Sequence, residues 1–505
     1  MPPEPAAALC HAGHPLYREE GLRARSSSLA AIFSFPVALA LALAALTVLT
    51  VRGRFADPDL WWHLKTGELI WTTHHIPSTD VFSYTAAGHP WVAHEWLSEA
   101  LMYGVYQAAG FTGLMAWQAA VASLLFILVY VVCSLYSGNA KVSLLGGLLA
   151  WLFGTIGLAI RPHLLGYLCL VLELFVIHLG RTRDRRWFWA LPPLFALWVN
   201  CHGSFVLGIA VLGIFLVCSW FEFSAGSLVS YSWPASHRKI LAAASVLSMA
   251  ALLVNPIGPR LVLYPFDLMF NQSLNLAAVN EWQPLDLSDG RAVMLFGVAA
   301  LVFALVTIRR KELKLDELLL FAVGFALALR HQRMLFVFGI LAAPIMCRLL
   351  ADAWDRYDAR RDLPVANAVL MAGALMAIWL GFPTARELQA QVDRASPTAA
   401  VDFIRRTGVH GRMLNEYEFG GYLIWALPGQ KVFIDGRCDL FDWTGVLAAY
   451  GRWATLLEDP KLLLEKYHID YCLLSKSAPI TRVLPYLPGW KPVYSDRVAQ
   501  VWIRN

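Results

Sequence analysis

Apolar stretches long enough to cross a bilayer recur through the first three quarters of this chain. A membrane-spanning helix needs about 20 apolar residues, and about eleven stretches come close to that length. Hydrophobic residues make up 58% of the chain and charged residues 15%, whereas a soluble protein carries about a quarter charged residues. The pattern predicts a polytopic α-helical membrane protein. The stretches lie near residues 30–50, 113–133, 142–160, 163–180, 187–200, 205–221, 240–256, 291–308, 315–330, 334–350 and 364–383.

Basic residues in the connections between these stretches predict the orientation of the chain. Cytoplasmic loops of membrane proteins carry an excess of Lys and Arg. With a cytoplasmic N-terminus, every basic connection lies on the cytoplasmic side. We therefore expect a cytoplasmic tail at 1–29, a transmembrane domain at 30–383 and an extracytoplasmic region at 384–505. The basic connections contain Lys141, Arg181–Arg186, His237–Lys239, Arg309–Lys311 and Arg356–Arg361.

The same orientation gathers the polar loops of the chain on the outer face. These are the long loop 51–112, the loop 257–290 and several short polar turns between apolar stretches. A transporter more often keeps its ionisable groups near the middle of the bilayer. The clustering at one face instead predicts a reaction centre at the membrane surface. The net charge of +5 is spread over the loops and indicates no nucleic-acid partner.

The first outer loop opens with two carboxylates and an imidazole. Asp57 can cap a helix that has Pro58 at its first position. The following residues, 60–71, have the composition of an amphipathic helix in the membrane interface. Asp59 and His63 are four residues apart and share one face of that helix. A second helix is expected to begin near Trp91.

Two further interpretations of this loop remain open. The aspartates can simply cap a helix that the tryptophans anchor. Alternatively, Asp, His and Glu are ligands that suit a divalent cation, although no cofactor is certain from the sequence. The pair His94 and Glu95 lacks the second His of a His-Glu-x-x-His motif, so the spacing matches no tight metal site.

An acidic motif just beyond the first transmembrane helix resembles that of the GT-C glycosyltransferases. This superfamily includes protein O-mannosyltransferases, the aminoarabinose transferase acting on lipid A, and oligosaccharyltransferases. The resemblance covers residues 30–383, and Asp57 and Asp59 match the family's Asp-x-Asp type motif. It implies interlocked membrane helices, a polyprenyl-phosphate-linked sugar donor and one loop carboxylate acting as general base with inversion. Asp59 is preferred as the base because it lies beside His63.

The run Asp57–His63 also resembles that of uncharacterised bacterial membrane proteins. This resemblance implies a multi-pass protein of the bacterial cytoplasmic membrane. The donor and the surrounding membrane lipid are the expected partners, and the acceptor is open among glycan, lipid and protein.

A donor of this kind has a phosphate leaving group, which needs cations or oriented hydrogen-bond donors. Arg side chains suit phosphate because their fork is planar, although an Arg near a helix end can also snorkel to the interface. Glu281, beside Trp282, adds a carboxylate with an aromatic neighbour, and His202 lies in a polar interruption that can line a cavity. The candidate substrate-binding residues outside the first loop are Arg161, His163, His202, Glu281, Arg330, His331 and Arg333.

The last 120 or so residues have the composition of a small globular domain. Short apolar runs alternate with helical patterns after residue 383, which predicts an α/β fold. Asp435 and Arg437 follow a predicted strand at 432–434, where α/β sheets commonly bind ligands. They are predicted to bind the acceptor or to cover the membrane site, or else to hold a turn together. Cys438 and Cys472 could pair or remain buried thiols.

The sequence thus favours an inverting glycosyltransferase of the hexosyltransferase type. It would transfer a sugar from a polyprenyl phosphate to an acceptor on the outer face of the membrane. Two other functions remain: a transporter or flippase of lipid-linked saccharide, and a non-catalytic assembly factor for envelope polysaccharide.

Overall fold

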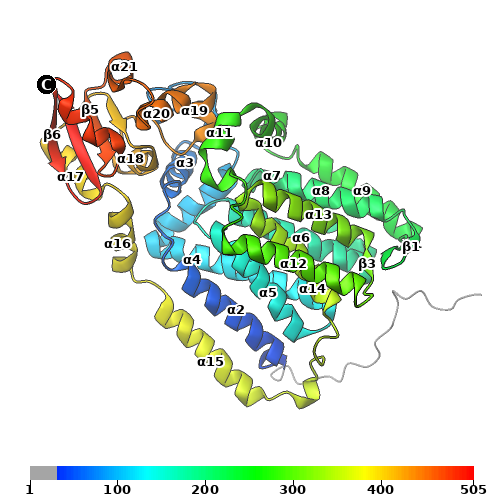
Figure 1. Cartoon of the computed structure of the whole chain (residues 1–505). Helices are drawn as coiled ribbons and strands as arrows, with labels where there is room; N and C mark the ends of the chain where they lie inside the picture. The colour runs from blue at the N-terminus through cyan, green and yellow to red at the C-terminus, as the bar shows by residue number, and fades with distance from the viewer. Residues whose placement is uncertain (1–30) are drawn as a thin grey trace, which may run out of the picture.

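The computed structural model describes residues 31–505 and consists mainly of helices (Figure 1). The predicted cytoplasmic tail, residues 1–29, lies outside this described part. The helices of the membrane body are α2 (Phe35–Val51), α4 (Trp96–Ser137), α5 (Ala140–Gly154), α6 (His163–Thr182), α7 (Leu191–Cys201), α8 (Phe205–Cys218), α9 (Ala235–Ala251), α12 (Gly290–Thr307), α13 (Leu315–Arg330), α14 (Leu335–Leu349) and α15 (Pro364–Gly381).

Six helical segments in residues 31–505 are long and apolar enough to cross a membrane, which makes this a membrane protein. Two shorter apolar helices, α2 and α8, accompany them. The remaining predicted spans form α7, α9 and α13, so every predicted stretch contains a helix. The count of eleven spans stays a prediction. The six segments are Trp96–Ser137, Ala140–Gly157, His163–Thr182, Gly290–Thr307, Gln332–Leu349 and Pro364–Gly381.

The centre of the membrane body is formed by α4, α5, α6 and α14. Nearly every residue of α14 is buried, and a methyl group on Gly146 of α5 would collide with the sulfur atoms of Cys133 and Cys347. The missing side chain therefore lets three helices approach closely. At the edge, α15 lies beside α2 (Figure 1) and leaves most of its apolar surface exposed, as suits a helix facing lipid.

Helix α4 contains one break that separates an interfacial part from a membrane-spanning part. Gly110 has φ 58° and ψ −149°, a conformation that glycine adopts readily because it has no Cβ. The helix begins at Trp96, slightly later than the predicted start near Trp91. Before it comes α3 (Leu60–Thr73), the predicted interfacial helix of the first loop.

The two ends of the membrane body differ. At one end lies a small sheet of β1 (Phe223–Ala225), β2 (Leu228–Ser230) and β3 (Leu313–Lys314). At the other end lie α3, α10 (Pro259–Asn271), α11 (Ser273–Ala278) and the C-terminal part of the chain (Figure 1). The functional candidates belong to this second end.

The C-terminal part contains a four-stranded sheet of order β4-β5-β7-β6. Strands β4 and β5 are parallel, and the other neighbours are antiparallel. The predicted strand at 432–434 is buried, yet it forms only an isolated bridge to Ser83. Its backbone is held instead by the side chain of Asn415, which accepts from Phe433 N–H and donates to the Ile434 carbonyl. Cys438 and Cys472 are buried free thiols.

The elements of this C-terminal part follow one another as α16 (Ala385–Ala395), α17 (Thr398–Thr407), β4 (Met413–Asn415), η6 (Tyr417–Phe419), α18 (Gly420–Ala426), α19 (Cys438–Trp443), α20 (Val446–Ala454), α21 (Pro460–Lys466), β5 (Tyr471–Ser475), β6 (Trp490–Ser495) and β7 (Ala499–Arg504).

The second hydrophobic core of the molecule joins this domain to the first outer loop. It consists of residues between Ala400 and Trp502 together with four residues of the loop, Trp62, Ala86, Trp91 and Ala93. The loop therefore packs as part of the C-terminal core, and this contact positions Asp59 beneath the domain.

Candidate active site

The two aspartates of the first loop lie directly before α3. The carboxylate of Asp57 accepts a hydrogen bond from the backbone N–H of Asp59 at 2.9 Å, which fixes the turn that starts the helix. Asp59 precedes the first residue of α3 and makes no capping hydrogen bond with its own side chain. Its carboxylate is therefore available for other contacts.

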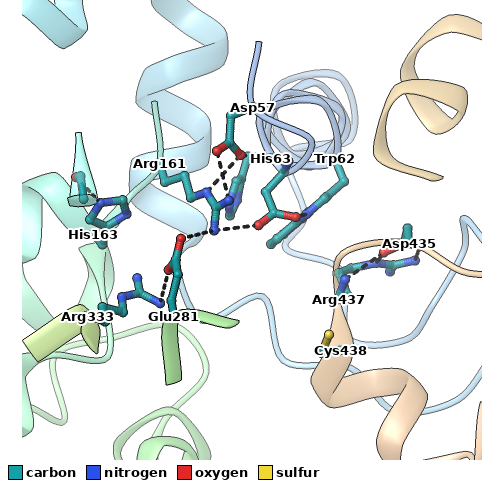
Figure 2. A network of polar contacts seen from close by, with 12 residues as sticks. Asp57, Trp62, His63, Arg161, His163, Glu281, Arg333, Asp435, Arg437 and Cys438 are labelled. Carbon is teal, nitrogen blue, oxygen red and sulfur yellow. Dashed lines mark hydrogen bonds and ion pairs between the residues drawn. The ribbon is translucent and has the colours of Figure 1, made fainter. Parts of the chain in front are cut away.

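Arg161 lies in the connection between α5 and α6 and binds both aspartates, and Figure 2 shows its contact with Asp57. Its Nε and Nη2 each donate to one carboxylate oxygen of Asp57 at 2.9 Å. Its Nη1 lies 2.9 Å from Oδ2 of Asp59. One guanidinium thus orients two carboxylates. When both carboxylates are ionised, the three groups together have a net charge of −1.

The remaining oxygen of Asp59 is held by a neighbouring indole. Trp62 Nε1 donates to Asp59 Oδ1 at 3.1 Å, and a methyl group on Gly436 would collide with the same oxygen. Burial raises the pKa of Asp59 to about 6, although the positive charge of Arg161 opposes the rise. A carboxyl group that loses its proton near neutral pH suits a general base.

Glu281 connects Arg161 to a second arginine. Its two carboxylate oxygens lie 3.8 Å from Arg161 Nη1 and 3.7 Å from Arg333 Nη1 (Figure 2). Arg333 also lies over the ring of Trp282, 5.5 Å from its centroid. These ion pairs are longer than hydrogen bonds, so the carboxylate lies loosely between two guanidinium groups.

The other polar residues of this region have different surroundings. His331 Nδ1–H donates to the carbonyl of Trp282 at 2.6 Å and so ties α13 to the loop that carries Glu281. Arg330 is exposed and does not join the cluster. His163 donates through Nε2–H to the Gly157 carbonyl at 2.7 Å, and its buried Nδ1 has no hydrogen-bond partner in the described chain.

A buried group of histidines and glutamates lies between α3 and α4. His63 Nδ1 is 3.0 Å from Glu99 Oε1 and 3.7 Å from Glu95 Oε2. His202 Nε2 is 3.2 Å from the other oxygen of Glu95, while its Nδ1 accepts from the backbone of Ser204. His94 lies at the edge of this group, 3.8 Å from Glu95, with its ring 4.6 Å from that of Tyr264.

This group has the donor set of a divalent-cation site. One ligand atom from each of His63, Glu95 and Glu99 lies within 4.8 Å of the others, and the second oxygen of Glu99 has no hydrogen-bond partner within residues 31–505. Burial, followed by the charge of Arg161, lowers the pKa of His63, and burial raises the pKa of Glu95 and of Glu99. Imidazole and carboxylate together suit Zn²⁺ and similar ions.

Asp435 and Arg437 form a buried ion pair in the C-terminal domain. Arg437 donates from Nε and Nη2 to Asp435 at 2.8 and 2.7 Å, and its Nη1 lies 2.7 Å from Asp80 of the first loop. Its guanidinium also lies 4.7 Å from the ring centroid of Trp91. These contacts fix the turn that contains Asp435 and Arg437 and hold it against the first loop. A role of the two residues in binding the acceptor stays a prediction.

Three residues of the site were not among the candidates chosen from the sequence. Glu99 lies four residues after Glu95, one turn along the same helix, and that spacing is a readable signal. Trp62 and Gly436 have no such signal. Their contacts with Asp59 depend on how the C-terminal domain packs against the first loop.

Comparisons with known proteins give a fold but no sequence relative. The sequence matches no protein-family model, and no curated protein matches it either. Several solved structures share its architecture. ArnT from Cupriavidus metallidurans in the apo state has a TM-score of 0.53 and 14% identity, covering 92% of this chain and 97% of that chain.

Two further solved structures have a fold similar to that of this chain. ArnT from the same organism bound to undecaprenyl phosphate has a TM-score of 0.51 and 14% identity over the same shares, 92% and 97%. The Archaeoglobus fulgidus oligosaccharyltransferase tethered with an acceptor peptide has a TM-score of 0.52 and 14% identity, covering 88% of this chain and 70% of that one. At 14% identity these likenesses show the fold alone, and this fold is the one that the resemblance to the GT-C glycosyltransferases predicts.

Proposed function

We propose that the protein is an inverting glycosyltransferase that uses a polyprenyl-phosphate-linked sugar. The GT-C neighbours support this proposal, since one of them, ArnT, is bound to undecaprenyl phosphate. The observation that carries it is the arrangement of Asp59 beside Arg161, with Arg333 joined to them through Glu281. A base and two phosphate-binding cations thus lie at the same end of the membrane body.

The reaction would take place in one displacement. Arg161 and Arg333 would hold the donor phosphate through charge-assisted hydrogen bonds. Asp59 would accept the proton of an acceptor hydroxyl group while the oxygen of that hydroxyl bonds to the anomeric carbon. The bond from that carbon to the phosphate oxygen breaks, and the polyprenyl phosphate leaves with the electron pair. Attack from the face opposite the leaving group inverts the anomeric centre.

The buried group at His63, Glu95 and Glu99 would hold a divalent cation. When bound, such a cation would supply positive charge near the donor phosphate. His202 would orient Glu95 by its hydrogen bond, and Arg161 would keep Asp57 and Asp59 fixed beside it.

The orientation of the chain and the identity of its membrane are also part of this proposal. We place the reaction on the outer face of the bacterial cytoplasmic membrane, since the basic connections lie at the end opposite the site. For example, Arg181 pairs with Asp316 at 2.8 Å near the β1–β3 sheet. The lipid tail of the donor would lie against the exposed apolar helices.

The test is a pair of measurements on the purified full-length protein in lipid nanodiscs. Mass spectrometry of co-purified lipids should find a polyprenyl-phosphate sugar. Asp59→Asn should keep undecaprenyl phosphate binding and lose about 10²–10⁴-fold in turnover, because a base acts only in the reaction. Asp286→Asn, an exposed control at the same end, should retain activity. Full turnover in Asp59→Asn would assign the base to another group, whereas absence of turnover in the unaltered protein would support the transporter or the non-catalytic assembly factor instead.

A further inference from the structure

A cavity lies in the C-terminal domain, at the carboxyl ends of β4 and β5, apart from the proposed active site. Its volume is about 320 Å³, which is within the usual range of about 300–1,000 Å³ for small-molecule sites. Neighbouring parallel strands of an α/β sheet commonly bind ligands in the crevice beyond their carboxyl ends. The polar and aromatic residues around this cavity include Glu416, Glu418, Tyr450, Trp453, Ser475 and Ser477.

Hydrogen bonds keep the wall of this cavity in place. Glu416, just after β4, accepts from Tyr450 Oη–H at 2.9 Å and from the backbone N–H of Ser475 at 3.1 Å. The hydroxyls of Ser475 and Ser477 lie 2.9 Å apart. The two strand ends and α20 are therefore joined through one carboxylate, and the cavity between them is preformed.

One buried donor in the wall lacks an acceptor. Trp453 is 1% exposed, and its indole Nε1–H has no hydrogen-bond partner among the described residues. This nitrogen has almost no accessible surface, so it lies within the wall and does not face a molecule in the cavity.

The charges around the cavity select the class of ligand. None of its lining residues is Lys, Arg or His, and burial together with the negative charge of Asp59 raises the pKa of Glu418. Such a site disfavours phosphate and carboxylate groups. It suits neutral hydroxyl groups, which can donate to a carboxylate and accept from a serine. The aromatic walls suit the apolar faces of a sugar ring.

The cavity is close to the aspartates of the proposed active site. The segment that leaves it, Glu416 to Gly421, packs on the first loop, since a methyl group on Gly421 would collide with the Pro58 carbonyl. Between them, Tyr417 Oη lies 2.8 Å from the sulfur of Cys438, two residues after Gly436. A molecule in the cavity would thus be separated from Asp59 by one short helical turn, η6.

We propose that this cavity binds an unphosphorylated, uncharged saccharide unit of the acceptor. That the saccharide belongs to the acceptor rests on the proposed transferase function, whereas its chemical class follows from the residues that line the cavity. The saccharide hydroxyls bind Glu418 and the serines, and the adjoining part of the acceptor reaches Asp59.

The test measures saccharide binding directly on the full-length protein in nanodiscs. The probes are glucose, galactose, mannose, N-acetylglucosamine, lactose, maltose and cellobiose, with glucose 6-phosphate as the charged comparison, observed by saturation-transfer-difference NMR. We expect at least one neutral probe to bind, and glucose 6-phosphate to bind at least about tenfold more weakly than glucose or not at all.

Two neighbouring substitutions form a matched pair. Ser477→Trp fills the cavity from an exposed lining position and should weaken binding by at least about tenfold. Lys476→Trp places the same side chain on an exposed residue that does not line the cavity, and it should change affinity by less than about twofold. Undecaprenyl phosphate binding should be equal in both variants.

The outcomes separate this inference from the proposed function. Absence of binding by every neutral probe, equal affinity of the two tryptophan variants, or equal binding of glucose 6-phosphate would overturn the inference, even in a protein that transfers sugar. Saccharide binding that only Ser477→Trp removes would support it. The same result in a protein without donor binding or turnover would overturn the transferase proposal and leave the ligand class of the cavity intact.

Discussion

At the scale of single residues, the central feature is a carboxylate whose two oxygens are both engaged. Asp59 is bound by Arg161 on one oxygen and by Trp62 on the other. Ion pairing alone would make it a weak base, yet burial outweighs the charge of Arg161 and raises the pKa of Asp59 to about 6. The site thus keeps the group oriented without depriving it of basicity at neutral pH.

The first prediction concerns the pH dependence of turnover. Asp59 accepts a proton only as the carboxylate, and its pKa is raised to about 6. The rate should therefore rise with pH through about 6 and level off above it. The measurement is kcat/KM against pH in nanodiscs. A rising limb centred near the ordinary Asp value of about 4 would assign the base to another group.

The second prediction concerns Glu281, which lies between Arg161 and Arg333 where the donor phosphate would bind. Glu281→Gln removes a competing negative charge, so undecaprenyl phosphate should bind several-fold more tightly, by about 1 kcal/mol. Calorimetric titration of the variant checks this. Glu312→Gln, near the β1–β3 sheet, is the control and should not change the affinity. Weaker binding in Glu281→Gln would show that the carboxylate contacts the donor favourably.

At the scale of elements, α3 and α4 approach closely enough to share one polar site. A methyl group on Gly67 of α3 would collide with the Glu99 carbonyl of α4. This close contact brings His63 to Glu95 and Glu99. Within residues 31–505 the buried carboxylates between the helices contact His63 and His202 but pair with no Lys or Arg, so a cation there would stabilise the packing of one helix on the other.

The third prediction tests that cation. Added Zn²⁺ should raise the Tm of the full-length protein, and a chelator should reverse the rise, because an ion that binds the folded state stabilises it. Glu99→Gln should abolish the shift, and elemental analysis should find less bound metal in this variant. Glu68→Gln on the exposed face of α3, where it pairs with Lys65, is the matched control. An equal shift in both variants would place the ion elsewhere.

The local sequence pattern predicted the helices and strands better than it predicted the contacts between them. Apolar length was enough for the helices, but the predicted cap was wrong by two residues, since Asp59 rather than Asp57 directly precedes α3. Residues 432–434 are apolar enough for a strand, but Val432 bonds to the backbone of the first loop, and the Asn415 side chain bonds to Phe433 and Ile434. Arg161 was a candidate on charge alone. Its pairing with Asp57, 104 positions away, depends on tertiary packing that no local pattern contains.

At the scale of the whole molecule, the C-terminal domain forms part of the proposed active site. The buried pair of Arg437 with Asp435 and Asp80 fastens the domain to the first loop. This contact places the backbone of Gly436 against Asp59 and Trp62. The α/β domain at 384–505 stays a prediction in its bounds, and the hydrophobic core of this part of the chain includes Trp62 and Trp91 of the first loop.

The last prediction tests whether this contact between domains sets the reactivity of Asp59. In Gly436→Ala the added methyl group would collide with Asp59 Oδ1 and would lie 3.0 Å from Trp62 Nε1. Because neither the buried ion pair of Arg437 nor the backbone beside it can move freely, the carboxylate should be displaced. Turnover should then fall by about 10²-fold, as expected for a misplacement of about 1 Å.

The measurement compares kcat, donor affinity and Tm of this variant with those of Gly451→Ala. Gly451 lies in the same domain and has no atom within 4 Å of an added methyl group, so its variant should keep full turnover. Gly436→Ala should keep its affinity for undecaprenyl phosphate, since Arg161 and Arg333 remain in place. A variant with normal kcat would show that the domain covers the site without positioning the base, and the Asp59 carboxylate would then depend on Arg161 and Trp62 alone.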